Sequence, residues 1–383
     1  MGICGGIAME TLLMIALMLA TAKLLGWIFE KLGQPVVLGQ ILGGLIIGVF
    51  AESNEIIREF ANLGVLLLLF LAGIESDLSE FKRVGKPSIL VAGIGVAVAF
   101  LFGFLVSLPF VEFHEALLYG AIMTPTSVSI TVRVLMELRR LRTREGTTIL
   151  AAAVVDDVLG ILVLTIVISL LREGSIHYDA VIEILIEVAG FLAIFLYLGP
   201  VLAEKAFKKI SRIDLPESTT TFAIVFLIFF AYLAEHLNLA SILGAYMVGL
   251  TLGQTSYKKR VESPINILGY SLFIPLFFVE VGMRIELGYI LHAGVFAVIY
   301  AVAAILSKII GCGLGAYLSG FGLKPSLRIG IGMIPRLGVE LAMLAMAMAS
   351  GIIGADALTV AIFMVFVTTI ITPPLLKWIY SKE

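Results

Sequence analysis

Two adjacent carboxylates, Asp156 and Asp157, stand in the middle of an otherwise apolar stretch, "AAAVVDDVLGILVLTI". Burying one charge at membrane depth costs several kcal/mol, so two together indicate a functional site. Successive helical residues point about 100° apart, which lets one carboxylate face a cavity while its neighbour meets another partner. Carboxylate oxygens bind hard cations such as Na⁺ or Li⁺, and they also take protons. The pair therefore predicts a site for which a cation and protons compete.

A basic residue that fits this pair lies far along the chain. Lys308, in "VAAILSKIIGCGLGAY", is at the centre of another long apolar stretch. A lysine near a helix end extends its ammonium group to the membrane surface, but no helix end is close to this position. We therefore predict that Lys308 is the counter-charge of the carboxylate pair.

Two prolines interrupt two further apolar stretches, Pro125 in "MTPTSVSIT" and Pro335 in "MIPRLGVEL". A proline inside a helix removes a hydrogen bond and clashes with the preceding turn, so a simple kink is one interpretation. A true break is favoured because paired interrupted segments are typical of transporter binding sites, where irregular backbone lines a cavity. The polar residues beside the prolines include Thr124, Thr126, Ser127, Arg336 and Glu340. The sequence thus predicts a crossed pair of broken helices.

Three ionisable residues in these stretches have roles that the sequence leaves open. Arg336 and Glu340 are four positions apart, a spacing that favours an ion pair on one helical face. Glu280, in "PLFFVEVGM", also lies deep in an apolar stretch. It is a candidate second cation ligand, a candidate partner of Arg336, or an interface residue.

Membrane helices must position these residues, because the composition is that of a membrane protein. Of 383 residues, 60% are hydrophobic and 14% are charged, and the mean hydropathy is +1.09, whereas soluble chains are about 25% charged. A bilayer span takes about 20 apolar residues. We expect an all-α polytopic protein with thirteen spans and without a sizeable soluble domain. The spans are placed at 7–29, 35–50, 61–75, 88–110, 115–138, 147–171, 179–201, 217–235, 238–254, 264–283, 289–318, 325–351 and 357–379.

The charge content argues against several other partners. The formal net charge is −2, which implies no bulk attraction to nucleic acid. Cys4 and Cys312 are far apart, and neither belongs to a CxxC motif, so no zinc site or disulfide framework is expected. We expect membrane lipid and small ions as partners.

The basic residues predict how the chain is oriented in the membrane. With the N-terminus outside, 19 of the 26 Lys and Arg residues fall in loops on the cytoplasmic side, and three fall outside. Cytoplasmic loops carry the excess of basic residues. We therefore expect a multi-pass protein of the cell membrane with its N-terminus outside and its C-terminus in the cytoplasm. The regular alternation favours thirteen spans over twelve.

The two halves of the chain carry matching segments in the same order. "QILGGLIIG" matches "SILGAYMVG" at an offset of 201, "LFLAGIESDL" matches "FVEVGMRIEL" at 209, and "GAIMTPTS" matches "GIGMIPRL" at 210. The two copies of each match are seven spans apart in chain order, an odd number, so the copies enter the membrane from opposite sides. The sequence predicts two six-helix inverted repeats joined by one helix, as in many secondary transporters.

The ordered motifs resemble the monovalent cation/proton antiporter superfamily, and within it the NapA-type Na⁺/H⁺ antiporters, which are related to NhaA and to Kef-type transporters. They are "LGQPVVLGQILGGLIIG", "LLLLFLAGIESDL", "TPTS", the Asp-Asp pair, "FFVEVGM" and "PRLGVELA", and they extend over essentially the whole chain. Two positions depart from the pattern. Gln40 stands where many relatives carry Glu, and Glu280 stands where relatives usually have a small polar residue.

The resemblance implies electrogenic exchange of Na⁺ or Li⁺ for H⁺ by elevator-type alternating access in a homodimer. It implies that Asp157 is the principal cation and proton carboxylate, that Asp156 pairs with Lys308, and that Thr126 and the broken-helix region line the site. The single membrane domain 1–383 would divide into dimerisation helices at 1–87 and 217–288, core ion-transport helices at 88–178 and 289–383, and a linker helix at 179–216.

Other functions use some of the same residues. A K⁺/H⁺ antiporter, a Kef-like potassium efflux transporter or a channel-like conduit would share this fold. An intramembrane aspartyl protease also needs two membrane aspartates, but on separate helices and often with a GxGD signature, which this sequence lacks. We therefore expect a transporter rather than an enzyme, with no cofactor besides the transported ions.

Overall fold

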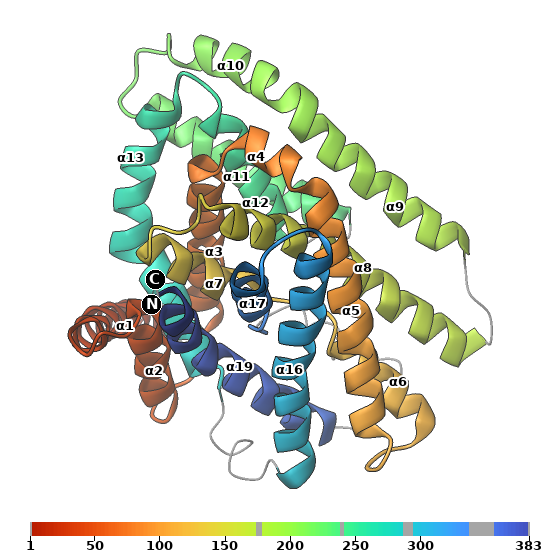
Figure 1. Cartoon of the computed structure of the whole chain (residues 1–383). Coiled ribbons are helices and arrows are strands. Elements are labelled where there is room, and N and C mark those ends of the chain that lie inside the picture. Colours follow the sequence, from red (N-terminus) through yellow and green to blue (C-terminus); the bar gives the residue numbers. More distant parts are fainter. Residues whose placement is uncertain (1, 174–177, 238–240, 286–293, 337–355, 382–383) are drawn as a thin grey trace. The chain divides into compact units, whose positions relative to one another are not determined.

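The computed structural model describes residues 2–173, 178–237, 241–285, 294–336 and 356–381, and every regular element in these ranges is helical (Figure 1). Helices satisfy their own backbone hydrogen bonds, which a bilayer core requires. The predicted all-α class is confirmed. The helices are α1 (Gly2–Lys31), α2 (Val36–Gly48), α3 (Glu55–Glu75), α4 (Leu78–Arg83), α5 (Gly85–Ser107), α6 (Phe113–Ile122), α7 (Val128–Glu137), α8 (Arg144–Glu173), α9 (Tyr178–Ala193), α10 (Gly199–Ile210), α11 (Ser218–His236), α12 (Ser241–Gly253), α13 (Lys258–Leu268), α14 (Ile274–Met283), α16 (Gly294–Leu318), α17 (Leu323–Gly332) and α19 (Asp356–Ser381), with π-helical turns at Ile194–Leu198 and Gly269–Phe273.

Nine helical segments within the described ranges are long and apolar enough to cross a bilayer, which confirms a multi-pass membrane architecture. The predicted spans 35–50 and 238–254 correspond to the shorter apolar helices α2 and α12, of 13 residues each. The predicted span 115–138 is interrupted between α6 and α7. The predicted span 325–351 begins with α17 and then enters residues outside the described ranges. The total of thirteen spans therefore stays a prediction.

Not every proline ends a helix. The sequence placed a helix end at 201 and a basic loop after it, but helical structure continues through Pro200 to the end of α10. The π-helical turn at Ile194–Leu198 precedes this proline, and a widened turn accommodates a residue that has no N–H. The same arrangement recurs at Pro275, which follows the turn at Gly269–Phe273 and opens α14. The predicted loop therefore begins after 210.

The contacts divide the chain into two compact units, and each unit draws on both halves of the sequence. Unit 1 consists of Met1–Glu75, Phe195–Leu233 and Ser241–Leu287. Unit 2 consists of Ser76–Ile194, Ala234–Ala240 and Gly288–Glu383. The roles predicted for such units, dimerisation and ion transport, stay predictions.

In unit 1, glycines let helix backbones cross at very short distances. A Cβ atom on Gly44 of α2 would lie 1.9 Å from the Val279 carbonyl oxygen of α14, and one on Gly282 would meet α2 equally closely. Gly73 of α3 and Gly249 of α12 form a matching crossing. Small residues at such crossings are how membrane helices approach closely, because apolar side chains gain little by leaving lipid.

These contacts recur in the two halves of the chain in a register that differs from the sequence alignment. Gly39 packs against the Leu25 carbonyl, and Gly244 packs against the Phe230 carbonyl. Both members of the second pair lie 205 positions after those of the first. The alignment of "QILGGLIIG" with "SILGAYMVG" used an offset of 201, so it was wrong by four residues, about one helical turn. A glycine-rich apolar sequence can be aligned with itself after a shift of one turn, whereas each glycine packs against one particular carbonyl.

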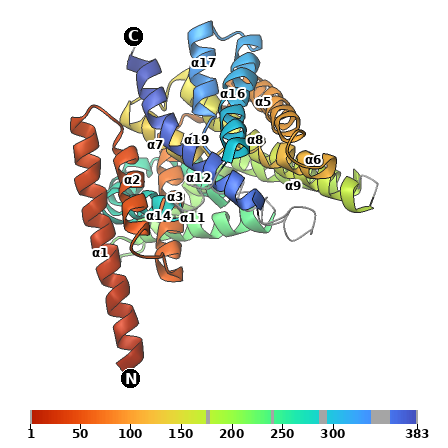
Figure 2. The same ribbon diagram turned by 90° about the horizontal axis from the view of Figure 1, so that it is seen from below.

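Unit 2 is built around α5 and α16, which lie side by side in both views (Figures 1 and 2). The face of α16 that packs inward is made of small residues such as Ala301, Ala304 and Gly311, and it also carries Lys308. A helix repeats its face every three to four residues. Because the lysine follows that spacing, it points into the protein rather than toward lipid.

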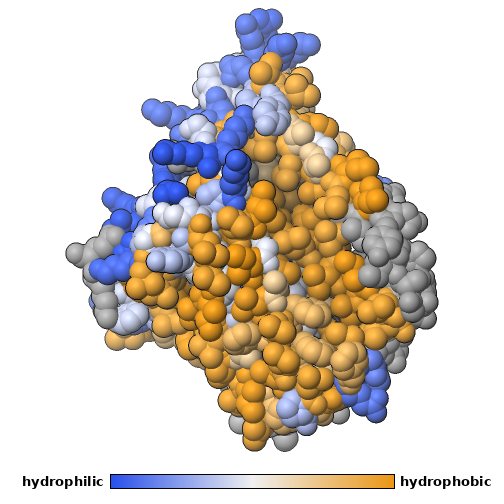
Figure 3. Space-filling model, turned by 45° about the vertical axis from the view of Figure 1, so that its right-hand side comes forward, coloured by the Kyte–Doolittle hydropathy of each residue, from blue (hydrophilic) through white to orange (hydrophobic). Residues whose placement is uncertain are grey.

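Much of the surface seen in Figure 3 is hydrophobic. Large apolar side chains are exposed along several helices, including Leu17 and Trp27 of α1, Phe229 of α11 and Leu306 of α16. A soluble protein does not present apolar surface on this scale. Such exposure is expected of helices that cross a bilayer.

Candidate functional site

Two interruptions in the helices of unit 2 contact each other. Helical structure stops for residues 123–127, between α6 and α7, and residues 334–336 are non-helical after α17. The Ser127 N–H donates to the Pro335 carbonyl at 2.7 Å, and the Thr131 hydroxyl donates to the backbone near the end of α17, also at 2.7 Å. The continuation of the second segment beyond 336 lies outside the described residues.

The break that Pro125 predicts is present, and the local hydrogen bonds explain it. In an unbroken helix the N–H at position 125 would donate to the Ala121 carbonyl, but proline has no N–H. That carbonyl instead accepts both the N–H and the hydroxyl of Thr124, at 3.0 and 2.8 Å. The helix therefore closes on its own last turn one residue before the proline.

The hydroxyls that the sequence placed at the site are buried in the first interruption. Thr126 is 2% exposed, and its hydroxyl donates to the Met333 carbonyl at 3.3 Å. Ser127 is 8% exposed and shares a 3.1 Å hydrogen bond with the Ser129 hydroxyl. A hydroxyl that donates its hydrogen still has lone pairs on oxygen. These oxygens keep the capacity to contact a cation.

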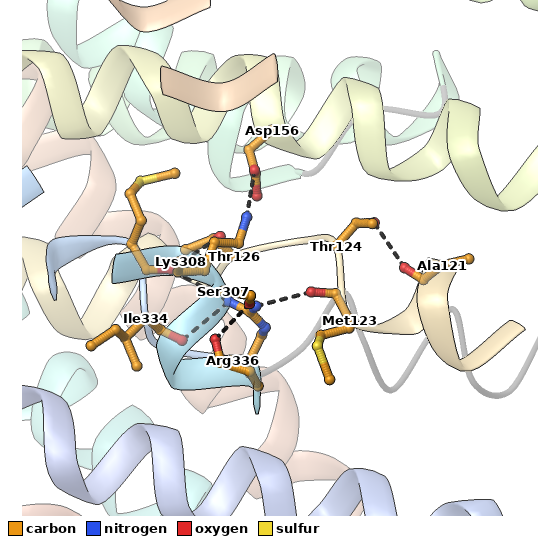
Figure 4. A network of polar contacts seen from close by, with 11 residues as sticks. Ala121, Met123, Thr124, Thr126, Asp156, Ser307, Lys308, Ile334 and Arg336 are labelled. Carbon is orange, nitrogen blue, oxygen red and sulfur yellow. Dashed lines mark hydrogen bonds and ion pairs between the residues drawn. The ribbon is translucent and has the colours of Figure 1, made fainter. Parts of the chain in front are cut away.

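Arg336 holds the two interruptions together through backbone carbonyls. Its side chain is fully buried, and its guanidinium donates to the carbonyls of Met123, at 2.9 Å, and Ile334, at 3.1 Å (Figure 4). Met123 is the C-terminal cap of α6, where unpaired carbonyls carry partial negative charge. A buried positive charge is stabilised at such a helix end. Glu340, its predicted partner, lies outside the described residues.

Asp156 and Lys308 form an ion pair inside unit 2. The Lys308 Nζ atom lies 2.7 Å from the Asp156 Oδ1 atom, and both side chains are 0% exposed. Figure 4 shows the ammonium group directed at the carboxylate and the Thr126 region close by. The contact brings α8 and α16 together as the sequence predicted. Removing either partner would leave a charge buried without its counter-charge.

Asp157 lies in α8, the helix that packs against the first interruption. Asp157 is 6% exposed, so it is buried almost as deeply as its neighbour. One turn beyond Asp156, Gly160 faces the break: a Cβ atom there would lie 3.3 Å from Pro125 and 3.5 Å from the Thr124 hydroxyl. The α8 face that carries Asp156 thus packs on the first interruption.

Glu280 has a partner that the sequence argument did not consider. Its side chain is 1% exposed and lies in unit 1, where its Oε1 atom is 2.6 Å from the Arg284 Nε atom and accepts a 3.3 Å hydrogen bond from the Ser53 hydroxyl. The suggested pairing with Arg336 is wrong, since that guanidinium binds backbone carbonyls in unit 2. The i, i+4 spacing to Arg284 was the available signal.

The sequence profile described as "Sodium/hydrogen exchanger, transmembrane" matches residues 17–382. The chain belongs to the sodium/hydrogen exchanger family. The resemblance to monovalent cation/proton antiporters, inferred from the ordered motifs, is thereby confirmed.

Two relatives match this exchanger over nearly their whole length. The Na⁺/H⁺-K⁺ antiporter GerN of Bacillus cereus is 36% identical over 379 residues, which are 98% of this chain and 97% of the relative. A Na⁺/H⁺ antiporter of Enterococcus hirae is 35% identical over 383 residues, covering 98% and 99%. Among solved structures, the sodium proton antiporter MjNhaP1 of Methanocaldococcus jannaschii has a TM-score of 0.70 at 21% identity and covers 97% of each chain. That likeness supports the fold.

A second buried arginine of the exchanger was missed because it was counted as a loop residue. Arg328 lies in α17, is 5% exposed, and places its Nη1 atom 3.4 Å from the Glu145 Oε1 atom. Its guanidinium also stacks over the Tyr380 ring, 4.6 Å from the centroid. It ties the first turn of α8 to the last turn of α19.

Proposed function

We propose that this exchanger moves Na⁺ or Li⁺ in one direction across the membrane and H⁺ in the other, with the two competing at Asp156 and Asp157. The observation that carries the proposal is the ion pair between Asp156 and Lys308, 2.7 Å apart and fully buried. An ionised pair is costly inside a membrane protein, so its presence indicates a role in transport or binding. Its position beside the interruption at 123–127 matches the sites of other secondary transporters.

In this proposal Asp157 is the principal ligand of the cation and of the proton. Lys308 neutralises Asp156, so Asp157 supplies the charge that attracts the cation. The hydroxyl oxygens of Thr126 and Ser127 are candidate further ligands. Among the described residues no three His, Cys, Asp or Glu side chains form a metal site. A cation would therefore complete its shell with hydroxyls, backbone carbonyls or water, which are ligands that hard ions accept.

Competition follows from the charge at the site. With both aspartates ionised and Lys308 protonated, the three side chains carry a net charge of −1, which one Na⁺ ion neutralises. Protonation of Asp157 removes that charge and the principal ligand at once. The cation and the proton then exclude each other, which is the requirement for coupled exchange.

We further propose that the exchange is electrogenic. If two protons load when one cation leaves, a net charge crosses the membrane in each cycle. The first proton goes to Asp157, and the second goes to Asp156 or to Lys308 after their ion pair opens. The second proton is therefore assigned to the ion pair as a whole rather than to one of its two residues.

Potassium is the second candidate cation, because GerN, the relative at 36% identity, is named a Na⁺/H⁺-K⁺ antiporter. A K⁺/H⁺ antiporter would use the same carboxylates and the same competition. The ligands proposed here are oxygens, and oxygen ligands accept either alkali cation. Only measured fluxes distinguish the two.

The architecture supports alternating access as the transport mechanism. The helices α6 and α17, which end at the two interruptions, have ten residues each and lie 210 positions apart. The equal length and spacing of these helices support two inverted repeats, as do the glycine contacts of unit 1 that recur at an offset of 205 positions. We propose that unit 2 carries the ion as the mobile body of an elevator, and that unit 1 is the body through which two copies form a homodimer.

We propose that the protein lies in the plasma membrane in the orientation that the basic residues predict. The N-terminus is then outside the cell and the C-terminus is in the cytoplasm. The end of α10 with the loop that follows it, 202–216, and the segment 254–260 then lie at the cytoplasmic surface. Between them they hold seven Lys and Arg residues. Cytoplasmic loops are basic in this way.

The test of the proposed function is cation-driven proton movement in proteoliposomes that contain only this protein. Vesicles loaded with protons receive NaCl, LiCl, KCl or choline chloride in turn, and the internal pH is followed with a fluorescent dye. We expect Na⁺ and Li⁺ to raise the internal pH and choline to leave it unchanged. A response to K⁺ alone would assign the second candidate. No response to any of the three alkali cations would contradict antiport.

A further inference from the structure

Unit 1 contains a pocket of about 260 Å³ whose lining suits an anion. It lies where α11 and α13 begin, and both helices start membrane-crossing segments there, Ser218–His236 and Lys258–Met283. The pocket is therefore at the boundary between the bilayer and water. The lining residues that bear on its chemistry are Glu217, Thr219, Thr220, Lys259, Arg260 and Ser263.

The first turn of α11 offers donors that nothing else in the described structure uses. The backbone N–H groups of Thr219 and Thr220 have no acceptor among the described residues, as expected at a helix N-terminus. Thr219 is only 2% exposed, yet its hydroxyl also has no hydrogen-bond partner among those residues. Buried polar groups are normally satisfied, so this hydroxyl indicates a missing acceptor at the pocket.

Two cations face this helix end from α13. Neither Lys259 nor Arg260 has an acidic group within 4.0 Å among the described residues, and both side chains are exposed at the pocket. Ser263, one turn further along α13, adds another hydroxyl. An arginine beside a helix N-terminus is a common arrangement for binding phosphate oxygens.

One carboxylate opposes them. Glu217 also lines the pocket, and its Oε2 atom accepts a 2.9 Å hydrogen bond from the Thr220 hydroxyl. The charged lining is then two positive groups and one negative group. The net charge of +1 favours an anion, and Glu217 lowers the affinity without reversing the preference.

Basic residues nearby strengthen the positive field. The segment 204–212 on and after α10 carries several Lys and Arg residues. Two contacts hold this segment near residues 256–257, just before α13. The Glu204 carboxylate accepts hydrogen bonds from the Ser256 N–H and hydroxyl at 2.9 and 2.7 Å, and the Ser211 and Tyr257 hydroxyls lie 3.2 Å apart.

We propose that this pocket binds a phosphate group, through the free N–H groups and hydroxyl at the start of α11 and the two cations of α13. Two sources share this chemistry. One is the headgroup of an anionic phospholipid, which lies at the depth where spanning helices begin and which cytoplasmic leaflets carry. The other is a soluble phosphate ester.

Binding to the purified full-length protein in detergent micelles tests the proposal and separates the sources. The probes for calorimetric titration are dioctanoyl phosphatidylglycerol, glycerol phosphate, and dioctanoylglycerol, which has the chains without the phosphate. Tighter binding of phosphatidylglycerol than of the other two assigns a lipid headgroup. Binding of glycerol phosphate at least as tight assigns a soluble ester. Equal binding of dioctanoylglycerol and phosphatidylglycerol, or no binding of either phosphate probe, overturns the proposal.

Variants locate the binding. Lys259→Gln with Arg260→Gln should raise the dissociation constant about tenfold or more, since charge-assisted hydrogen bonds are lost. Glu217→Gln should lower it, a gain that misfolding cannot produce. The control, Lys205→Gln with Lys209→Gln, removes the same charge outside the pocket. A defined site is contradicted if the control loses as much affinity for the phosphate probe as the Lys259 and Arg260 variant, or if Glu217→Gln does not bind the probe more tightly.

Discussion

The Lys308 Nζ atom lies 2.7 Å from the Asp156 Oδ1 atom, across 152 positions of sequence and with both side chains fully buried. This contact joins α8 of the first half of the chain to α16 of the second. It neutralises one of two neighbouring carboxylates and thereby sets Asp157 apart from Asp156. Asp156 and Asp157 have identical side chains, and they differ in that Asp156 is the one paired with the lysine.

The first prediction concerns the stability of this pair. Asp156→Asn or Lys308→Gln alone leaves one buried charge uncompensated, at a cost of about 3–5 kcal/mol. The double variant removes both charges and should recover much of that loss. Thermal unfolding of the purified protein in detergent measures all four species. Additive losses in the double variant would mean that the two side chains do not interact.

The second prediction concerns the helix crossing in unit 1. Gly44→Ala places a methyl group 1.9 Å from the Val279 carbonyl oxygen, so the helices must separate, at a cost of about 1–3 kcal/mol or more. Gly93→Ala is the matched control, because its methyl group has no neighbour within 4 Å and alanine favours a helix by about 1 kcal/mol. Melting temperatures should fall for the first variant only. Equal melting temperatures would refute the close crossing.

The third prediction concerns orientation. Cysteines introduced singly at Glu112 and Arg142, both exposed, should differ in their reaction with a membrane-impermeant maleimide added to intact cells. Glu112→Cys should be labelled and Arg142→Cys should not, in a background where Cys4 is serine and the buried Cys312 is kept. The reverse pattern would invert the proposed topology.

Much of the site was predictable because burying charge is expensive. A charged side chain in an apolar stretch needs a partner, so Lys308 could be assigned to the carboxylate pair from its position alone, and the family resemblance named Asp156 as the partner. The break at Pro125 was predictable for a similar reason, since proline removes a known hydrogen bond. Both inferences depend on a local cost that any fold must meet.

What could not be predicted depends on which helices meet. Arg336 binds the Met123 carbonyl at a helix end that lies more than 200 positions away in sequence, and no spacing rule reports such a contact. The repeat register was misread by one turn because glycine-rich sequence resembles itself at that shift. The π-helical turns before Pro200 and Pro275 could not be predicted, because an apolar stretch carries no signal for a local change of helix type.

The fourth prediction concerns charge movement. If two protons exchange for one cation, an inside-negative potassium–valinomycin potential should drive sodium flux in oriented proteoliposomes without a pH gradient. The flux should reverse direction when the sign of the potential is reversed. Sodium flux indifferent to the potential would mean one-for-one exchange and would remove the argument for a second proton at Asp156 and Lys308.

The fifth prediction addresses the central claim, that one buried carboxylate binds cation and proton in turn. Asp157→Asn removes the charge and the protonation site while nearly preserving shape, so the variant should fold with an unchanged melting transition. Asp214→Asn, at an exposed position, is the matched control.

The decisive measurement is sodium-driven proton efflux from proteoliposomes reconstituted with equal amounts of the wild-type protein and these two variants. We expect wild-type efflux from Asp214→Asn and none above the protein-free background from Asp157→Asn. Wild-type efflux from folded Asp157→Asn would contradict the account.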